Sequence, residues 1–446
     1  MRCASRGIWP AILTSIFTLA VTGPVLATGG DLAGVVRDTL STNPDVAEAR
    51  NRWLARREEV RAAEGGFLPS LDLNAGIGYE YTDSPSTRVR DDGSNELTRT
   101  ELGLAARQML FDGWGTRSEV SRQQARADSA AAQLLSVGES TAMKAAKAYV
   151  DLQRYKDLRQ ISKENLDIHY RIQDQIRLRS EAGVGRRADY EQVRSRVALA
   201  EVNLVAADVN LLDAHTTFQR VVGKPPKAAY APAEIPSGTF PESLQQAMNI
   251  AQTNNPVLHT AAADIEAARA QHDAAKQYDY PRFDLELNGN MNDDIDGTEG
   301  EVDDMSAMLR MRFNLYRGGT DGARKRATAH NINEAKDIRD RSVRQLDETI
   351  RLAWAAYEAT AAQVPLFERQ VVAATATRDA YAKQFNIGQR TLLDVLNSEN
   401  EVLQGRESLV ETRAEHLLAQ YRVLEAMGAL VDSFDAGAEL ALEQQR

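Results

Sequence analysis

Cysteine and aromatic residues are scarce in this sequence. The 446 residues include one cysteine, Cys3, and only 6% are aromatic. Because Cys3 lies in an N-terminal segment that we expect to be removed, a disulfide framework, a cysteine nucleophile and a lipidated cysteine are excluded from the mature chain. After Ala27 there is no run of about 18 apolar residues, so no transmembrane helix is predicted. The formal net charge of −11 disfavours nucleic acid as a partner.

The N-terminus has the pattern of a secretory signal peptide. Two arginines precede an apolar run over residues 8–26, and Val25-Leu26-Ala27 fits the small-residue rule for signal peptidase. We therefore expect residues 1–27 to be cleaved off and the mature protein to leave the cytoplasm. An uncleaved membrane anchor is the alternative, which the short run and the good cleavage site disfavour.

The chain contains two copies of one pattern. Two pairs recur at an offset of 212 residues: Asn43-Pro44 with Asn255-Pro256, and Pro69-x-x-Asp72 with Pro281-x-x-Asp284. Three later pairs recur at an offset of 205 residues: Leu110-Phe111-Asp112-Gly113 with Leu315-Tyr316-Arg317-Gly318, Ala148-Tyr149 with Ala353-Trp354, and Gly183-x5-Asp189 with Gly388-x5-Asp394. The offset changes only once, so the repeat does not arise by chance. We predict structural repeats over residues 28–221 and 243–431, a linker over 222–242 and a C-terminal tail over 432–446.

Each repeat contains two segments in which apolar and polar residues alternate, as in a strand with two unlike faces. In the first segment Leu71, Leu73 and Ile77 alternate with polar residues and glycine. The predicted strands cover about residues 71–82, 98–111, 283–292 and 305–316. Strands of this length can cross a bilayer at a tilt. Water-soluble hairpins that lie on the helices are the alternative.

Four strands are too few to close a membrane barrel. An open sheet edge is not tolerated in lipid, because its backbone N–H and C=O groups find no partner there. If the hairpins lie in a membrane, several copies of the chain must share one barrel: two copies give eight strands and three give twelve. The membrane interpretation therefore predicts a homo-oligomer.

A long helical pattern and a shorter returning one follow each hairpin. They cover about residues 115–179 and 188–221 in the first repeat and about 320–386 and 391–428 in the second. The first returning helix has a heptad seam that begins with Val193, Val197 and Ala200. Alanine in core positions lets helices pack closely side by side into a layer or a tube. The predicted fold class is mainly α with a β part, in two tandem repeats of helix, β-hairpin and long helical hairpin.

No catalytic motif is visible. The sequence lacks a P-loop, a Gly-x-Ser-x-Gly motif and a dinucleotide-binding loop. Its histidines lack metal-binding spacing and are expected to be exposed helix residues; they are His169, His215, His259, His272, His330 and His416. The segment from Asn292 to Asp304 carries seven acidic residues, but their spacing does not fit an EF-hand. A solvated hairpin loop is preferred there over a calcium site, and we predict no enzyme activity, cofactor or metal.

Four features occur together in this chain: a signal peptide, a duplicated unit of helix, hairpin and long helix pair, a Leu-Phe-x-Gly-like sequence at each strand-to-helix junction, and Gly-x5-Asp at each helix turn. This combination resembles the TolC family of outer-membrane efflux and secretion proteins. The resemblance implies a homotrimer whose twelve strands close an outer-membrane β-barrel, continued by a periplasmic α-helical barrel. It further implies a passive duct that receives substrate from an inner-membrane exporter, either ABC or proton-driven, through a periplasmic adaptor.

The resemblance also implies a gate at the helix turns of Gly183 and Gly388, at the periplasmic tip. Asp394 matches the first of two aspartates that form acidic rings in the family, and Asn397 stands at the second position. Three aspartates near one axis would repel one another and attract cations. The other interpretation of Asp394 is a helix N-terminal acid stabilised by the helix dipole, and both interpretations can hold.

A latch belongs to the same implied gate. Arg390 matches an arginine that ties the inner helices shut in the family, and Asp189 matches one of its acceptors. Phe385 stands where the family has a tyrosine, so the hydrogen bond of that tyrosine is lost. The expected remainder of the latch is a contact between Arg390 and Asp189.

Two classes of function compete. The first is a passive exit duct of a tripartite export system, in the outer membrane of a Gram-negative bacterium and extending into the periplasm. Its implied use is type I protein secretion or efflux, and the family resemblance slightly favours secretion. The second is a soluble periplasmic coiled-coil scaffold or adaptor without channel activity. The sequence identifies neither the exported substrate nor the pump.

Overall fold

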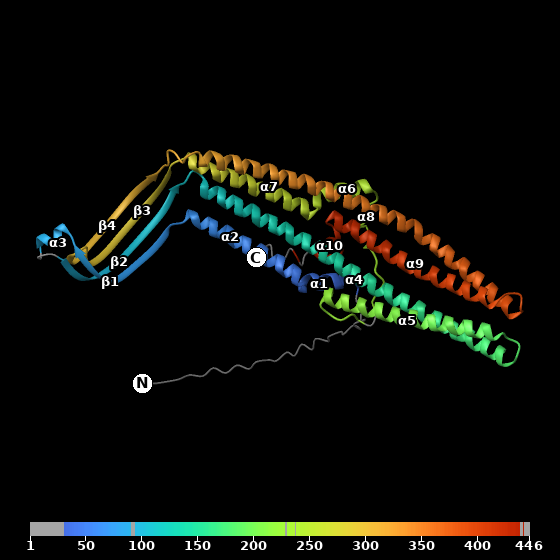
Figure 1. Cartoon of the computed structure of the whole chain (residues 1–446). Coiled ribbons are helices and arrows are strands. Elements are labelled where there is room, and N and C mark those ends of the chain that lie inside the picture. The colour runs from blue at the N-terminus through green and yellow to red at the C-terminus, as the bar shows by residue number, and fades with distance from the viewer. Residues whose placement is uncertain (1–30, 91–93, 228–229, 237, 438–439, 441–446) are drawn as a thin grey trace, which may run out of the picture.

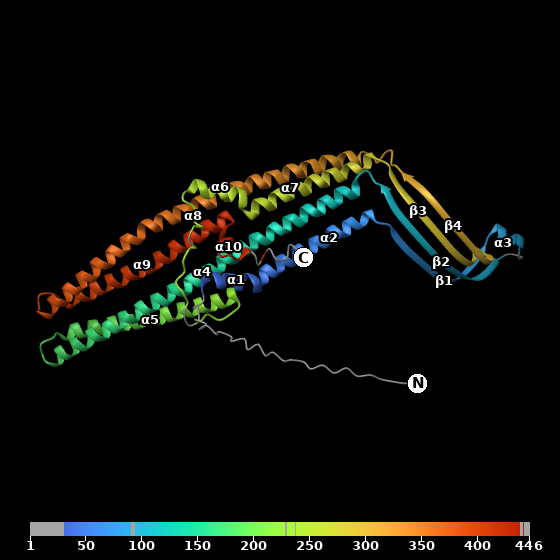
Figure 2. The ribbon, with the colours of Figure 1, turned by 180° about the vertical axis from the view of Figure 1, so that it is seen from behind.

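The computed structural model describes residues 31–90, 94–227, 230–236, 238–437 and 440. The expected signal peptide, residues 1–27, lies outside these ranges. A curved β-sheet forms one end of the molecule, and long helices extend from it (Figure 1). The view from behind shows the same elongated arrangement, with two helix turns at the end opposite the sheet (Figure 2).

Each repeat begins with two helices that meet at an Asn-Pro pair. The helices are α1 (Leu32–Thr42) and α2 (Pro44–Glu64) in the first repeat, and α6 (Leu244–Asn254) and α7 (Pro256–Ala275) in the second. The Asn43 side chain accepts a hydrogen bond from the N–H of Asp45 at 2.9 Å, and Asn255 caps its helix in the same way. Proline at the first helical position needs no N–H partner. The pair therefore ends one helix and starts the next.

Four antiparallel strands form one sheet in the order β1-β2-β3-β4. They are β1 (Ser70–Asp83), β2 (Ser94–Phe111), β3 (Arg282–Ile295) and β4 (Thr298–Arg312), with a short helix α3 (Pro85–Arg90) between β1 and β2. Short 3₁₀ turns, η1 (Gly65–Phe67) and η2 (Lys276–Asp279), lead into the two hairpins. The β2–β3 pairing joins the hairpins. Within the described chain, the outer edges of β1 and β4 have no strand partner.

The acidic segment of the second hairpin is mostly strand, and the expectation of a solvated loop there was wrong. β3 runs to Ile295 and β4 starts at Thr298, which leaves a two-residue turn of Asp296 and Gly297. Both turn residues have positive φ, 53° and 69°. This is the conformation of the type I′ turn, which Asp-Gly favours because its twist matches that of the strands.

β4 ends at Arg312, short of the end near residue 316 that the alternation predicted. The Asn314 side chain accepts a hydrogen bond from the N–H of Tyr316 at 3.1 Å. Such a local turn competes with strand pairing for backbone groups. The chain therefore leaves the sheet before the long helix begins.

The longest helices are α4 (Gly115–Glu181) and α8 (Thr320–Asn386), each of 67 residues. That length corresponds to about 100 Å at 1.5 Å per residue. Their returning partners are α5 (Arg187–Val222) and α9 (Leu392–Met427). Nearer the sheet, α2 and α7 pack against α4, and α7 also packs against α8; α9 crosses to α4 and joins the repeats. Pro365 lies inside α8, where it removes one backbone hydrogen bond without ending the helix.

The main core lies where α4, α9 and the linker meet. Tyr149 and Tyr421 are fully buried there. The Tyr149 hydroxyl donates to the carbonyl of Ala231 at 2.5 Å, and the Tyr421 hydroxyl donates to the carbonyl of Glu234 at 3.1 Å. The described part of the linker is therefore bound to both repeats.

Glu139 of α4 holds the segment that follows α9. Its buried carboxylate accepts hydrogen bonds from the N–H groups of Leu430 and Val431, at 3.0 and 3.3 Å, at the start of α10 (Leu430–Ser433). Burial disfavours the charged form and raises the pKa of the Glu139 carboxyl to about 8 despite these two bonds. This carboxyl is therefore a buried link between the first repeat and the C-terminal segment.

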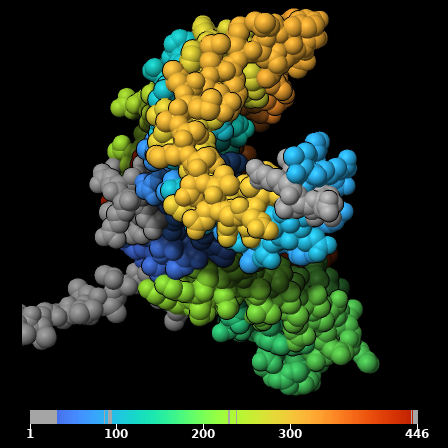
Figure 3. Space-filling view, turned by 90° about the vertical axis from the view of Figure 1, so that its left-hand side faces the viewer, coloured from blue at the N-terminus to red at the C-terminus, as the bar shows by residue number. Residues whose placement is uncertain are grey.

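Viewed from the sheet end, the molecule is a curved wall that is hollow on one side (Figure 3). The chain is mainly helical, with two β-hairpins in two like repeats, so the expected fold class is confirmed. In the described ranges, no helix combines the length and apolar character needed to span a membrane.

Candidate functional surfaces of the sheet and the helix turns

The strand register places most of the apolar side chains of the four strands on one face of the sheet, here called the apolar face. Cross-strand neighbours on it include Leu73 with Leu104, Ala106 with Leu287, and Leu285 with Leu309. These side chains are not covered: Leu73, Ile77 and Met305 are 69%, 80% and 88% exposed. A continuous apolar surface of this size marks a site of contact with lipid or another protein.

Aromatic side chains lie at both ends of the sheet. Tyr79 and Tyr81 are exposed near the hairpin tips. At the helix end, the Trp114 ring lies 5.1 Å from that of Phe111 and 5.0 Å from that of Tyr280, both edge-on. Aromatic groups at the two ends of an apolar band are typical of membrane barrels, where they sit at the interfaces.

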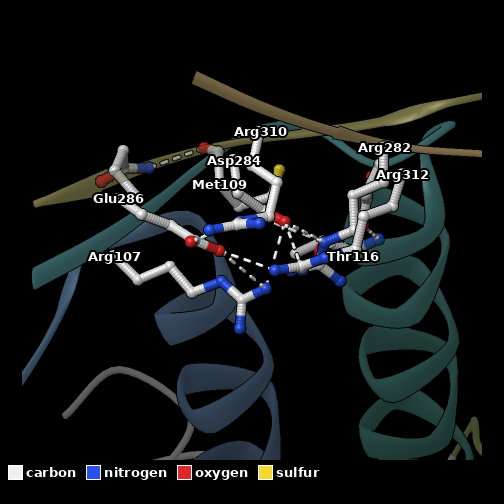
Figure 4. Close-up of polar contacts among 10 residues, drawn as sticks. Arg107, Met109, Thr116, Arg282, Asp284, Glu286, Arg310 and Arg312 are labelled. Carbon is white, nitrogen blue, oxygen red and sulfur yellow. Dashed lines mark hydrogen bonds and ion pairs between the residues drawn. The ribbon is translucent and has the colours of Figure 1, made fainter. Parts of the chain in front are cut away.

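The opposite face, here called the polar face, carries a charged cluster near the helices (Figure 4). The charged cluster consists of Arg107, Arg282, Asp284, Glu286, Arg310 and Arg312. The Asp284 side chain is fully buried and lies 3.0–3.2 Å from the guanidinium nitrogens of three of these arginines. Glu286 lies 2.7 Å from Arg310 and 2.6 Å from Arg312. Four positive and two negative side chains leave an excess of two positive charges per chain.

The hairpin tips are also joined across the repeats. The Gly297 N–H donates to a Glu80 carboxylate oxygen at 2.9 Å, and the other oxygen accepts from Arg99 at 2.7 Å. A Cβ atom at Gly297 would lie 2.6 Å from the Thr87 side chain, so the close approach of the two hairpins requires glycine here. Both ends of the β2–β3 seam are thus fixed by polar contacts.

At the second helix turn, Asp394 forms a capping box at the start of α9. Its carboxylate accepts hydrogen bonds from the Thr391 hydroxyl at 2.8 Å and the Thr391 N–H at 3.2 Å, while the Asp394 N–H donates to the Thr391 hydroxyl at 3.3 Å. The bonds from Thr391, and more weakly the charge of Arg390, hold the pKa of the Asp394 carboxyl below its usual value. The helix-terminal role of Asp394 is therefore present in the structure.

Arg390 contacts side chains of its own repeat. Its guanidinium lies over the Tyr381 ring at 4.2 Å, donates to Gln384 at 3.0 Å and lies 3.9 Å from the Asp394 carboxylate. Asp189, half-buried in the first turn of α5, is not among these partners. A latch between Arg390 and Asp189 stays a prediction. Asn397, the other gate candidate, is exposed one turn after Asp394 on α9.

The contact that joins the two helix turns comes from Arg179, at the end of α4. Its guanidinium lies over the Phe385 ring at 4.8 Å and donates to the Asn386 side chain at 3.2 Å. This arginine was not among the predicted gate residues. Its position in the last turn of a helix was the only signal, and many arginines share it.

An apolar cluster lies behind these turns and also joins the repeats. Val193 and Leu396 are almost completely buried in it, and Phe385 packs on its margin. The other buried members are Leu166, Ile176, Val197, Ala200 and Leu392. The tip therefore has an apolar base beneath its polar contacts.

The described ranges contain no group of three or more histidine, cysteine, aspartate or glutamate side chains arranged to hold a metal. The expectation that the histidines are exposed was wrong for His169. This side chain is 5% exposed, and its Nδ1 lies 2.9 Å from the Asn165 carbonyl oxygen. One backbone contact within a helix satisfies the ring in a packed interface, which histidine spacing in the sequence cannot show.

This chain is similar to known outer membrane proteins in both sequence and fold. The chain is 27% identical over 405 residues to the outer membrane efflux protein BepC of Brucella suis biovar 1 (strain 1330), covering 90% of this chain and 85% of BepC. It is 22% identical over 418 residues to the outer membrane protein TolC of Escherichia coli (strain K12), covering 91% and 83%. The solved Campylobacter jejuni CmeC outer membrane channel has the same fold, with a TM-score of 0.78 at 14% identity, covering 90% of this chain and 86% of CmeC.

The family model described as outer membrane efflux protein matches residues 35–224 and 247–429. These segments make up most of the chain; the second falls within repeat 2, and the first covers repeat 1 from residue 35 and the first three residues of the predicted linker. The expected family, outer-membrane location and transport function are thereby confirmed, as is the expectation that the protein is not an enzyme. The chain belongs to the outer membrane efflux protein family.

Proposed function

We propose that three copies of this protein form one export duct, with a twelve-stranded barrel in the outer membrane and a helical tube in the periplasm. The observation that carries this proposal is the uncovered apolar face, which is continuous across both hairpins. In a barrel this face contacts lipid, and the polar face with its charged cluster lines the lumen.

The open sheet edges support several copies per barrel. β1 and β4 each have a strand neighbour on one side only within the described chain. In lipid these edges leave backbone groups unsatisfied at a cost of several kcal/mol each, which pairing with another copy removes. The curved, hollow wall also requires further copies to enclose a lumen (Figure 3).

The duct is passive, and energy comes from its partners. An inner-membrane exporter, ABC or proton-driven, and a periplasmic adaptor dock at the helix turns of Gly183 and Gly388. Relatives of this chain include a proteases secretion protein of Dickeya chrysanthemi and a probable efflux pump outer membrane protein of Pseudomonas putida. The substrate is therefore either a secreted protein or a small molecule, and the proposal leans to secretion.

Membrane extraction and electrophoresis test the duct. We expect the protein to leave membranes only with detergent, to run as an SDS-resistant trimer and to conduct ions in planar bilayers. A monomer released by osmotic shock, without conductance, would replace the duct by the alternative function, a soluble periplasmic scaffold.

The proposed gate is the ring of three Asp394 side chains. We expect Asp394→Ala to raise the conductance and weaken block by divalent cations, because it removes three converging negative charges. Thr391→Ala is the matched control, since it removes the capping bond at 2.8 Å and keeps the charge. Unchanged conductance and block in Asp394→Ala would remove this residue from the gate.

A further inference from the structure

The sequence repeat specifies the register in which the outer edge of β4 in one copy can pair with the outer edge of β1 in the next. We propose that β4 of one copy pairs with β1 of the next in the register that sets Arg312 opposite Asn74 of the partner subunit, and that Asp72 of the partner subunit binds Arg312. This inference rests on the proposed trimeric barrel and deepens it, because it names the contacts that close the barrel.

The first step is that the two hairpins are equivalent in register. Ser70 lies opposite Arg107 in the first hairpin, and Arg282 lies opposite Arg312 in the second. These positions differ by the same offsets, 212 and 205 residues, that relate the repeats in sequence. Each residue of β1 therefore has a known equivalent in β3, and each residue of β2 up to Arg107 has one in β4.

The second step uses the β2–β3 seam as a template for the seam between copies. The sheet passes from the hairpin of repeat 1 to the hairpin of repeat 2 at this seam, and in a ring of repeats it continues from β4 to the next β1 in the same way. Applying the two offsets to the β2–β3 register gives the opposite pairs Arg312 with the partner's Asn74, Leu309 with the partner's Ile77, and Ala307 with the partner's Tyr79. Apolar residues again meet apolar residues on one face, which a slip of one residue would prevent.

The third step is charge. In the β2–β3 seam Arg107 lies 3.2 Å from Asp284, the buried acid that is diagonal to it across the strands. The equivalents of these two residues are Arg312 and Asp72 of the partner subunit. Asp72 is exposed, and its carboxylate has no hydrogen bond or ion pair to any other residue that the structure describes.

The charged cluster has an excess of positive charge, and the Asp72 carboxylate has no positively charged partner, so each can supply the counter-charge of the other. The cluster has two more guanidinium groups than carboxylates, and Arg312 is 47% exposed while it contacts Asp284 and Glu286. A guanidinium has five N–H donors, so Arg312 can bind a third carboxylate. With Asp72 of the partner subunit the excess falls from two positive charges to one per chain, or three in the trimer.

Paired cysteines test the register in the full-length protein with Cys3→Ser. The variant Ile77→Cys with Leu309→Cys is expected to form disulfide-linked ladders on non-reducing gels, because directly opposite Cβ atoms lie within disulfide reach. The pairs Ala75→Cys with Leu309→Cys and Tyr79→Cys with Leu309→Cys represent slips of two residues. We expect them to link about tenfold less, because diagonal neighbours are about 7–8 Å apart.

A double-mutant cycle tests the ion pair. Asp72→Asn is expected to lower the temperature at which the SDS-resistant trimer dissociates in the wild-type protein, and to have little further effect in an Arg312→Gln background, where the partner guanidinium is already absent. Glu101→Gln is the matched control, since Glu101 is a polar-face acid that is bound to Arg99 within the chain and lies away from the proposed seam between copies. An equal effect of Asp72→Asn in both backgrounds would overturn the ion pair.

The outcomes separate this inference from the proposed function. A trimer in which only a slipped pair links overturns the register and leaves the duct intact. A protein that stays monomeric in every variant and in the wild type overturns both. Ladders from Ile77→Cys with Leu309→Cys support the register whatever the charge variants do.

Discussion

The two helix turns have the same backbone and different chemistry. Gly183 and Gly388 both adopt the left-handed conformation, with φ of 75° and 80°, and each is followed six residues later by an aspartate. A Cβ atom at either glycine would meet nothing within 4 Å. Both glycines are therefore required for conformation and not for space.

The difference lies at the start of the returning helix. Thr391 caps α9 and binds Asp394, whereas Arg186 occupies the equivalent place before α5 and makes no side-chain cap. The carboxylate of Asp394 is thus bonded within its own turn, and that of Asp189 has no such bond. Asp189 and Asp394 match in sequence, but only the Asp189 carboxylate is left without a capping bond and so available to a partner.

The largest expected effect comes from removing the apolar base that the two turns share. Leu396→Ala deletes a side chain that is 1% exposed and packs between the repeats, so it should lower the free energy of unfolding by about 2–5 kcal/mol. Guanidinium unfolding followed by circular dichroism, at constant protein concentration, measures this. Leu393→Ala, at a site that is 44% exposed, should change it by less than about 0.5 kcal/mol. Equal losses would show that the cluster does not join the turns.

Substitution of either turn glycine by alanine should lower the free energy of unfolding by a similar amount. Gly183→Ala and Gly388→Ala each force a side chain into the left-handed region, at a cost of about 1–2 kcal/mol. The same unfolding measurement on both variants checks this. A loss at only one turn would mean that the other can adopt a second backbone conformation, and the equivalence of the turns would fail.

The caps should respond in opposite directions. Thr391→Ala removes a capping box and should lower the free energy of unfolding by about 1 kcal/mol. Arg186→Thr places a capping hydroxyl three residues before Asp189 and should raise it by a similar amount. Hydrogen exchange at the first turns of α5 and α9 would locate both effects. An Arg186→Thr protein without added protection would show that the first turn differs in more than its cap.

The smallest expected effect is a pH dependence at the second turn. Because the pKa of Asp394 is lowered in the folded protein, its contribution to stability is present above its ordinary pKa and is lost as pH falls through the folded value. The stability difference between wild type and Asp394→Asn should therefore shrink on acidification below about pH 4. The difference between wild type and Asn397→Ala, an uncharged site on the same helix, should stay constant. A pH-independent Asp394→Asn difference would contradict the capping account.

Patterns of period 2 and 3.6 were sufficient to predict the hairpins and long helices, because such patterns report which face of an element is buried. Leu71, Leu73 and Ile77 alternate in the sequence and share one face of β1. The patterns did not predict the turn at Asp296 and Gly297, because acidic residues continue through both strands and no change of pattern marks where each strand ends. The Asp-Gly pair, which is typical of a two-residue hairpin turn, was the signal that indicated it.

The candidate site was less predictable. The repeat pattern was sufficient to place Asp394 at a helix turn. Its hydrogen bond to the Thr391 hydroxyl was not predicted, because the family resemblance concerned the aspartate alone. Arg179 and the charged cluster were missed because their partners lie on other elements. Asp284 is buried by arginines from three strands, and no local pattern in the sequence contains that fact.

The β2–β3 seam also bears on the order in which the protein folds. Arg107 and Asp284, bonded across it, are separated by 177 positions in the chain. The β2 edge of the first hairpin therefore has no partner until β3 is made. Pairing over such a separation is slow, and exposed strand edges aggregate. We expect that step to limit the rate of sheet formation and to be the point at which the chain most needs protection in the periplasm.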